Sequence, residues 1–161
     1  MANLAQIESY LQQFELEYQI IDLGDEIFTV KGVVETGVKE GEIVKTLIVR
    51  VNGSPSIHRI SGSESFVALA TRGKDRLDFK KVRKLFGNKT ELAKPDEVLR
   101  VCGVPIGAVC PILLNIPVVF DRRVVDLVHV NLGSGDLTKG LEMELADLFK
   151  AVSDYKIEDL V

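Results

Sequence analysis

The sequence predicts an α+β domain built on a mixed, closed or partly open β-barrel with peripheral helices. Three observations support this fold class. Many short segments carry the β-branched and aromatic residues of strands, few segments show helical periodicity, and repeats, linkers and low-complexity segments are absent. With 161 residues, of which 46% are hydrophobic and 27% charged, we expect a single domain over 1–161 with a packed core.

The most informative segment is a predicted strand over 42–51. Apolar, mostly β-branched residues dominate it, and Lys45 is the exception. A lysine in such a run loses hydration unless its ammonium reaches water, a carboxylate or a ligand anion. Two interpretations remain open: a lysine that reaches solvent from a half-exposed strand, and a lysine at the mouth of a pocket that points at a phosphate or a carbonyl.

Helical spacing and capping residues predict the helices. An apolar residue recurs every three or four positions in 3–14 and 77–86, while Pro95 suits the first turn of a helix that ends at Gly103. The segment 27–36 is ambiguous, although Val30, Val33 and Val34 could face a core from a short helix. The predicted helices are 3–14, 77–86, 95–102 and 145–152.

The remaining apolar segments predict short strands separated by turns. Asn52-Gly53 is a hairpin signal, 61–64 is a predicted loop, and a tight turn is expected at 121–123. Glycine loops are expected at 103–111 and 131–136. Besides 42–51, the predicted strands are 18–21, 56–60, 65–70, 91–93, 117–120, 124–130 and 140–144.

Composition excludes several classes of protein. No apolar run is long enough to span a bilayer, and the first residues lack the basic and apolar regions of a signal peptide. Cys102 and Cys110 are the only cysteines, and no secretory context supports a disulfide. We therefore expect a reducing, cytoplasmic setting and no membrane partner.

Positive charge is concentrated in one segment. Residues 72–89 carry eight Lys and Arg against two Asp, a net charge of +6 in a chain whose net charge is −4. Such a segment on an acidic body suits local contact with a phosphate backbone. The alternative is the solvated face of an amphipathic helix. On the first interpretation, we predict that Lys80, Lys81 and Lys84 contact nucleic acid.

Familiar catalytic and metal-binding motifs are absent. The chain has no GxGxxG, P-loop or GxSxG motif. His58 and His129 fall in separate predicted strands, and the seven residues between Cys102 and Cys110 do not match metal-site spacing. We expect buried, unreactive thiols, no metal and no cofactor.

Three small groups of residues remain as candidates for a site. They are Lys45-Thr46, the glycine loop 102–111, and Gly133-Ser134-Gly135-Asp136. Glycine allows close approach of a ligand to the backbone and exposes N–H groups. Together the three groups predict a pocket with one cation and two loops of backbone donors, which could bind an ester or a phosphate without a protein nucleophile.

The order of these parts is itself informative. Residues 43–47 (Ile-Val-Lys-Thr-Leu) are followed by Gly103, a GxxxP segment at 107–111, residues 116–121 and Gly133-Ser134-Gly135. In this order and spacing, the chain resembles, from about 18 to 152, the YbaK-like family of aminoacyl-tRNA deacylases. That family is related to the editing domain inserted in bacterial prolyl-tRNA synthetases.

The resemblance implies the fold of that family and hydrolysis of the ester that joins a wrong amino acid to the terminal adenosine of tRNA. It implies that Lys45 holds the phosphate or ester and that Gly107 offers backbone contacts to the carbonyl or to water. The implied partners are the acceptor end of mischarged tRNA and, as a further candidate, an aminoacyl-tRNA synthetase. The implied substrate-binding residues are Thr46, Gly103, Ala108, Pro111, Gly133, Ser134 and Asp136.

Three positions depart from the family pattern, because Cys102, Ala108 and Cys110 stand where members often have Thr, Gly and Ser. These departures leave room for other functions. We therefore rank three hypotheses: a freestanding trans-editing hydrolase for mischarged tRNA, a non-catalytic module that binds a nucleotide, a tRNA end or a synthetase, and an unrelated small-molecule hydrolase on the same fold.

Overall fold

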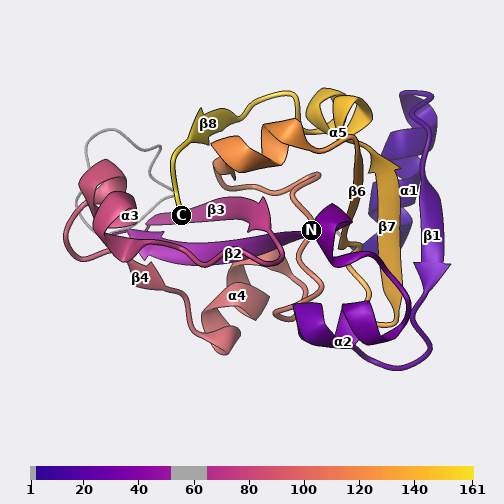
Figure 1. Cartoon of the computed structure of the whole chain (residues 1–161), viewed down its shortest axis with the longest axis horizontal. Helices are drawn as coiled ribbons and strands as arrows, with labels where there is room; N and C mark the ends of the chain where they lie inside the picture. Colours follow the sequence, from indigo (N-terminus) through magenta and orange to yellow (C-terminus); the bar gives the residue numbers. More distant parts are fainter. Residues whose placement is uncertain (1–2, 52–64) are drawn as a thin grey trace.

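The computed structural model describes residues 3–51 and 65–161, which form two β-sheets flanked by helices (Figure 1). One sheet has the strand order β1-β7-β6, and the other has the order β4-β2-β3-β5-β8. In the view of Figure 1, β1, β6 and β7 run steeply across the direction of β2 and β3. The strands are β1 (Gln19–Asp22), β2 (Val44–Val51), β3 (Ser65–Arg72), β4 (Glu91–Leu92), β5 (Val118–Asp121), β6 (His129–Gly133), β7 (Lys139–Glu144) and β8 (Lys156–Glu158).

The central pair is antiparallel, and its register places Lys45 of β2 opposite Thr71 of β3. β5 is parallel to β3, and β8 is parallel to β5. A single parallel bridge between Ile43 and Asn131 joins the two sheets beside the first residues of β2. The mixed α+β class is confirmed. The described strands form two bridged sheets and no closed ring, so the predicted barrel is not confirmed.

Local sequence explains where the helices begin and end. Asn3 caps α1 by accepting from the amide of Gln6 at 3.0 Å, and Asp78 caps α3 by accepting from the amide of Lys80 at 2.9 Å. Pro95 begins α4, which ends at Gly103 in a left-handed conformation. The helices are α1 (Leu4–Gln13), α2 (Val30–Glu35), α3 (Phe79–Phe86), α4 (Pro95–Cys102) and α5 (Leu145–Val152), with short 3-10 helices η1 (Glu40–Glu42) and η2 (Arg122–Asp126).

Successive side chains of β2 point to opposite faces of the sheet, and each face packs against a different part of the core. Val44 and Ile48 face a large cluster with α1, α4, α5 and the strands of the smaller sheet. Val49 and Val51 face the other way and pack with Val67, Leu69 and α3. Because both faces are covered, β3 is buried at seven of its eight residues and β2 at four of its eight, with the rest of β2 partly buried.

Several sequence predictions need correction. The strand predicted over 124–130 is wrong in its first half, because Asp121 accepts from the amide of Arg123 and starts η2 there. The loop predicted from Asn131 begins later, because Asn131 to Gly133 pair with β7. β8 was not predicted. The predicted hairpin at 52–53, strand 56–60, loop 61–64 and His58 lie outside the described residues.

Candidate functional site

A cavity of about 260 Å³ lies beside the first half of β2, where the two sheets meet. Its walls come from α2 and the residues before it, from the loop between α4 and β5, and from the turn between β6 and β7. The sequence-predicted residues that line it are Lys45, Thr46, Gly107, Gly133 and Asp136. The fold therefore brings the three groups of predicted site residues to one place.

Lys45 is half-buried at the start of β2. Its ammonium donates to the backbone carbonyl oxygens of Gly73, at 3.3 Å, and of Asp75. Burial lowers the pKa of Lys45 below its ordinary value of 10.5; the Asp75 carboxylate opposes this and the Arg76 guanidinium adds to it. The same ammonium makes no ion pair with a carboxylate among the described residues. Lys45 thus adds to the cavity wall a positive charge that no carboxylate pairs directly in the described part of the chain.

A second cation of the cavity wall is neutralised. The ammonium of Lys139 lies 3.2 Å from the carboxylate of Asp22. The pKa of Asp22 is lowered mainly by a hydrogen bond from the backbone amide of Gly24, and then by Lys139. Lys45 is therefore the better candidate for attracting an anionic or carbonyl group of a ligand.

Thr46 follows Lys45 on the strand, so its side chain leaves the opposite face. Its hydroxyl oxygen is buried and has no hydrogen-bond partner in the described part of the chain. A buried hydroxyl without a partner costs free energy, of the order of ~1–3 kcal/mol. Because Thr46 also lines the cavity, a ligand group could supply the missing partner.

Gly107 stands at the closest approach between the 103–111 loop and the segment before α2. Its φ is +90°, and a Cβ at this position would lie 2.9 Å from the carbonyl oxygen of Phe28. Both facts require glycine here. Its backbone N–H makes no hydrogen bond among the described residues, whereas the N–H of Ala108 donates to Pro105 at 3.1 Å. Gly107, and not Ala108, therefore presents a free donor at the cavity.

The two glycine loops are packed directly against each other. A Cβ on Gly133 would lie 2.3 Å from the carbonyl oxygen of Val109, and the amide of Gly135 donates to the carbonyl oxygen of Ala108 at 2.8 Å. The absence of a side chain at Gly133 is thus what lets the loops meet. This contact explains physically why two glycine segments far apart in the sequence form one wall.

Ser134 and Asp136 have different places in the second loop. The hydroxyl of Ser134 is fully buried, where it donates to the carbonyl oxygen of Lys139 at 2.7 Å and accepts from the amide of Asp136 at 3.2 Å. The carboxylate of Asp136 lines the cavity and accepts from the hydroxyl and amide of Thr138, which lower its pKa in that order. Ser134 therefore shapes the loop, and Asp136 presents an anionic wall.

Four residues that the resemblance places at the substrate do not line this cavity. Gly103 ends α4 in a left-handed conformation, and Ala108 and Ser134 are buried. Pro111 lines a separate cavity of about 630 Å³ between α3, α5 and β8. The structure therefore does not place these four residues in the wall of the cavity that contains Lys45.

Phe28, Ile106 and Asn131 are among the cavity residues that were not singled out from the sequence. Phe28 and Ile106 are exposed apolar side chains on two walls, with 53% and 41% of their surface accessible. Asn131 is buried, and its amide nitrogen donates to Glu142 at 3.3 Å. Exposed large apolar residues at a cavity suit the binding of a flat or apolar ligand group. Only tertiary contacts bring these three segments together, so no local pattern could have identified them.

Groups that commonly act as nucleophiles or metal ligands are not gathered here. Cys102 and Cys110 are buried, and burial raises their pKa values to about 11 and about 12. His129 is exposed on β6. Within 3–51 and 65–161, no group of three or more His, Cys, Asp or Glu residues could hold a metal ion, and no helix is long and apolar enough to cross a membrane.

Comparison with known proteins identifies the family. The profile of the aminoacyl-tRNA editing domain matches residues 26–151, which include all the residues that line the cavity except Leu23. The chain belongs to the aminoacyl-tRNA editing domain family. The resemblance found from the motifs is thereby confirmed.

Relatives of this editing domain include two bacterial proteins. A proline–tRNA ligase of Geobacter sulfurreducens is 35% identical over 104 residues, which are 63% of this chain and 16% of the ligase. The uncharacterized protein YwhH of Bacillus subtilis is 29% identical over 110 residues, which are 68% of this chain and 64% of YwhH. The matched part thus spans less than two thirds of either relative.

Solved structures share the fold of this editing domain over nearly its whole length. A hypothetical protein is 28% identical, with a TM-score of 0.78 and coverage of 96% of this chain and 98% of its own. A candidate trans-editing enzyme for prolyl tRNA synthetase is 23% identical, with a TM-score of 0.75 and coverage of 98% and 95%. At 23% identity, the similarity to this second structure concerns the fold alone.

Proposed function

We propose that this editing domain hydrolyses the ester of mischarged tRNA in trans, releasing the wrong amino acid from the terminal adenosine. The observation that carries the proposal is the meeting of Lys45, Gly107 and Asp136 in one small cavity of an editing-domain fold. The volume of about 260 Å³ lies just below the range of ~300–1,000 Å³ typical of pockets for drug-sized ligands. It suits an aminoacyl group better than a whole nucleotide.

In the proposed reaction, water attacks the carbonyl carbon of the ester. The bond from that carbon to the ribose oxygen breaks, the ribose oxygen takes up a proton from the attacking water and becomes a hydroxyl, and the products are a free amino acid and a tRNA that carries no amino acid. Gly107 offers its unused N–H to the oxyanion, and Lys45 offers its ammonium to the ester or the neighbouring phosphate. A positioned donor of this kind contributes ~10²–10³ in rate.

Water is the proposed nucleophile because the two thiols and the Ser134 hydroxyl are poorly placed to attack a ligand in the cavity. The thiols of Cys102 and Cys110 are buried and carry raised pKa values, so almost none is ionised near neutral pH. The Ser134 hydroxyl is buried and held by backbone groups on both sides. Positioning and stabilisation of charge are what this cavity can contribute.

Relatives suggest the substrate and the partner. The Geobacter sulfurreducens relative is a proline–tRNA ligase, and one structural neighbour is described as a candidate trans-editing enzyme for prolyl tRNA synthetase. We therefore propose the acceptor end of tRNA as the macromolecular substrate and a prolyl-tRNA synthetase as the associated enzyme. The exposed Phe28 and Ile106 would contact the terminal adenosine or the amino-acid side chain.

A panel of mischarged tRNAs tests the activity. Alanyl-, cysteinyl- and prolyl-tRNAs, matched and mismatched, are incubated with the wild-type protein, Lys45→Ala and Lys150→Ala. Lys150 is an exposed lysine of α5 and serves as the control for the loss of one surface charge. We expect at least one tRNA to be deacylated by wild type and Lys150→Ala, and at least tenfold more slowly by Lys45→Ala. Equal rates for all three proteins would refute the proposal, whereas tight binding of an aminoacyl-adenosine analogue without turnover would favour a binding module.

A further inference from the structure

The loop that follows β3 forms the outer support of Lys45. Gly73 and Asp75 accept from its ammonium through their backbone carbonyl oxygens. The amide of Gly73 donates to the carbonyl oxygen of Ile43 at 2.7 Å, and a Cβ on Gly73 would lie 3.0 Å from Val30. Ile43 and Val30 both line the cavity, so the 73–76 loop is packed directly on the cavity wall.

This loop presents two free cations. Lys74 and Arg76 are exposed, and neither has a hydrogen bond or ion pair among the described residues. The one carboxylate between them, on Asp75, is bound by the guanidinium of Arg72 at 2.7 and 3.3 Å. Arg76 lies close enough to Lys45 for its charge to act on the Lys45 ammonium. The loop that holds the Lys45 ammonium therefore carries two further positive charges, on the residues that flank Asp75.

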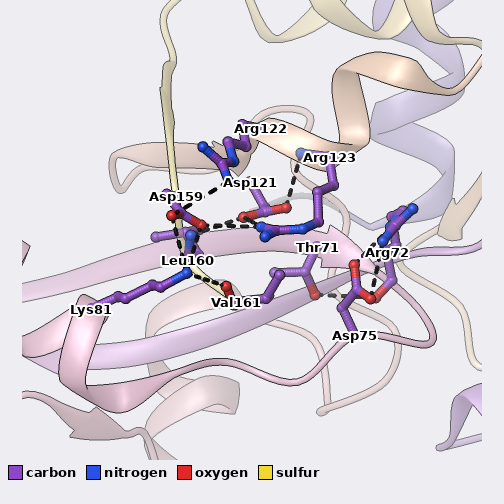
Figure 2. Close-up of polar contacts among 10 residues, drawn as sticks. All are labelled: Thr71, Arg72, Asp75, Lys81, Asp121, Arg122, Arg123, Asp159, Leu160 and Val161. Carbon is purple, nitrogen blue, oxygen red and sulfur yellow. Dashed lines mark hydrogen bonds and ion pairs between the residues drawn. The ribbon is translucent and has the colours of Figure 1, made fainter.

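The lysines predicted from the sequence lie elsewhere. Helix α3, which carries Lys80, Lys81 and Lys84, is at the opposite end of β2 and β3 from α2 and the cavity (Figure 1). Figure 2 shows Lys81 directed at the carboxylate of Asp159, 3.0 Å away, and at the backbone oxygen of Val161, 2.6 Å away. Lys81 is thus already paired within the fold, and Lys80 and Lys84 are remote from the proposed ester.

We propose that Lys74 and Arg76 bind the phosphates of the unpaired RNA strand that delivers the ester to the cavity. This inference rests on the proposed function, since it assumes that the ligand is the 3′ end of a tRNA. An ester at the end of an RNA strand necessarily brings phosphates to the rim of its cavity. Free cations beside Lys45 would neutralise them, whereas the cations of α3 would reach only more distant parts of the RNA.

Salt dependence gives the expected size of the effect. Each phosphate neutralised on a single strand contributes a slope of ~0.7 to the fall of log K with log salt concentration. Loss of two contacts should therefore reduce the slope by about 1.4. Both side chains are exposed, so substitution should change the free energy of unfolding by less than about 0.5 kcal/mol.

The test compares two double variants that lose the same charge. We titrate both variants, Lys74→Ala/Arg76→Ala and Lys80→Ala/Lys84→Ala, with an RNA minihelix that carries no amino acid and ends in the unpaired CCA of tRNA. The titrations are repeated at several salt concentrations. We expect the first variant to bind at least tenfold more weakly, with a reduced salt slope, and the second to resemble wild type. If Lys80→Ala/Lys84→Ala binds more weakly than Lys74→Ala/Arg76→Ala, the proposal is wrong and the phosphate contact lies on α3. Equal weakening by both variants would show a diffuse electrostatic effect and would also contradict the proposal.

A second readout separates a contact with RNA from an effect on Lys45. For the deacylation of mischarged tRNA we expect Lys74→Ala/Arg76→Ala to raise KM with little change in kcat. For aminoacyl-adenosine, which has no phosphate, kcat/KM should be unchanged. An equal loss on both substrates would mean that the two cations act through Lys45, and the RNA contact would be wrong. If no substrate is hydrolysed, the proposed deacylase function is wrong. The binding comparison still decides whether Lys74 and Arg76 contact RNA.

Discussion

The ammonium of Lys45 donates to the backbone carbonyl oxygen of Gly73, 3.3 Å away, just beyond the last residue of β3. The contact joins the cation of the cavity to the loop that packs on the cavity wall. Two constraints hold that loop: the hydrogen bond from Gly73 to Ile43, and the lack of space for a side chain at Gly73. The position of the Lys45 charge therefore depends on a glycine that the sequence motif does not include.

Gly73→Ala tests this dependence. The new Cβ would lie 2.8 Å from a methyl carbon of Ile43, so the loop must move. We expect a loss of about 1–3 kcal/mol in the free energy of unfolding, as for other overpacked sites, and a fall in deacylation rate at temperatures where the protein is fully folded. Gly41→Ala is the matched control, because nothing lies within 4 Å of a Cβ there. A Gly73→Ala protein with wild-type stability and rate would show that the loop does not position Lys45.

The lowered pKa of Lys45 predicts how stability changes with pH. Burial disfavours the ammonium, so the charged form costs stability at every pH below the pKa of the folded state. Between that pKa and 10.5 the unfolded chain binds more protons than the native one, so the cost disappears as pH rises. The free energy of unfolding of Lys45→Met minus that of wild type should therefore be largest near pH 7 and decrease toward pH 10. Urea unfolding of both proteins at the two pH values measures this, and a difference that grows with pH would contradict the assigned shift.

Some elements could be predicted because their signals are local. Pro95, the early acidic residues and Gly103 mark both ends of α4, and the β-branched run marks β2. The strand predicted after β5 was wrong in its first half. Val124 and Val125 are typical of strands, but the side chain of Asp121 accepts from the amide of Arg123 and starts a 3-10 helix. Local propensity is a weak signal when a neighbouring side chain can satisfy the backbone differently.

The site shows the same division between local and tertiary signals. The sequence indicated Lys45, Gly107 and Gly133, whose residue types are unusual for their surroundings. It could not indicate that Lys81 is paired with Asp159, 78 positions away, or that α3 lies at the opposite end of β2 and β3 from α2 and the cavity. Helical periodicity places residues on a face, but only the packing of α3 shows which way that face points.

The two thiols provide a test of the nucleophile. With pKa values of about 11 and about 12, Cys102 and Cys110 should be ionised to only ~10⁻³ and ~10⁻⁴ at pH 8. We expect iodoacetamide at pH 8 to leave the native protein unmodified and its deacylation rate unchanged over a time in which the urea-unfolded protein reacts at both thiols. Rapid alkylation of the native protein with loss of activity would identify a cysteine as a reacting group, and mass spectrometry would show which one.

The last prediction concerns the buried hydroxyl of Thr46, which has no partner in the described chain. Thr46→Val keeps the shape and removes the hydroxyl, so the free protein should be as stable as wild type or more stable, by up to about 1–3 kcal/mol. If the hydroxyl binds the substrate, deacylation should nevertheless slow by about three- to tenfold, the size of one net hydrogen bond. Thr46→Ser is the control, because it keeps the hydroxyl while losing the methyl group, and it should show the opposite pattern of lower stability and a retained rate. Parallel measurement of urea unfolding and kcat/KM for the three proteins decides the matter, and a rate that follows stability across the series would make Thr46 purely structural.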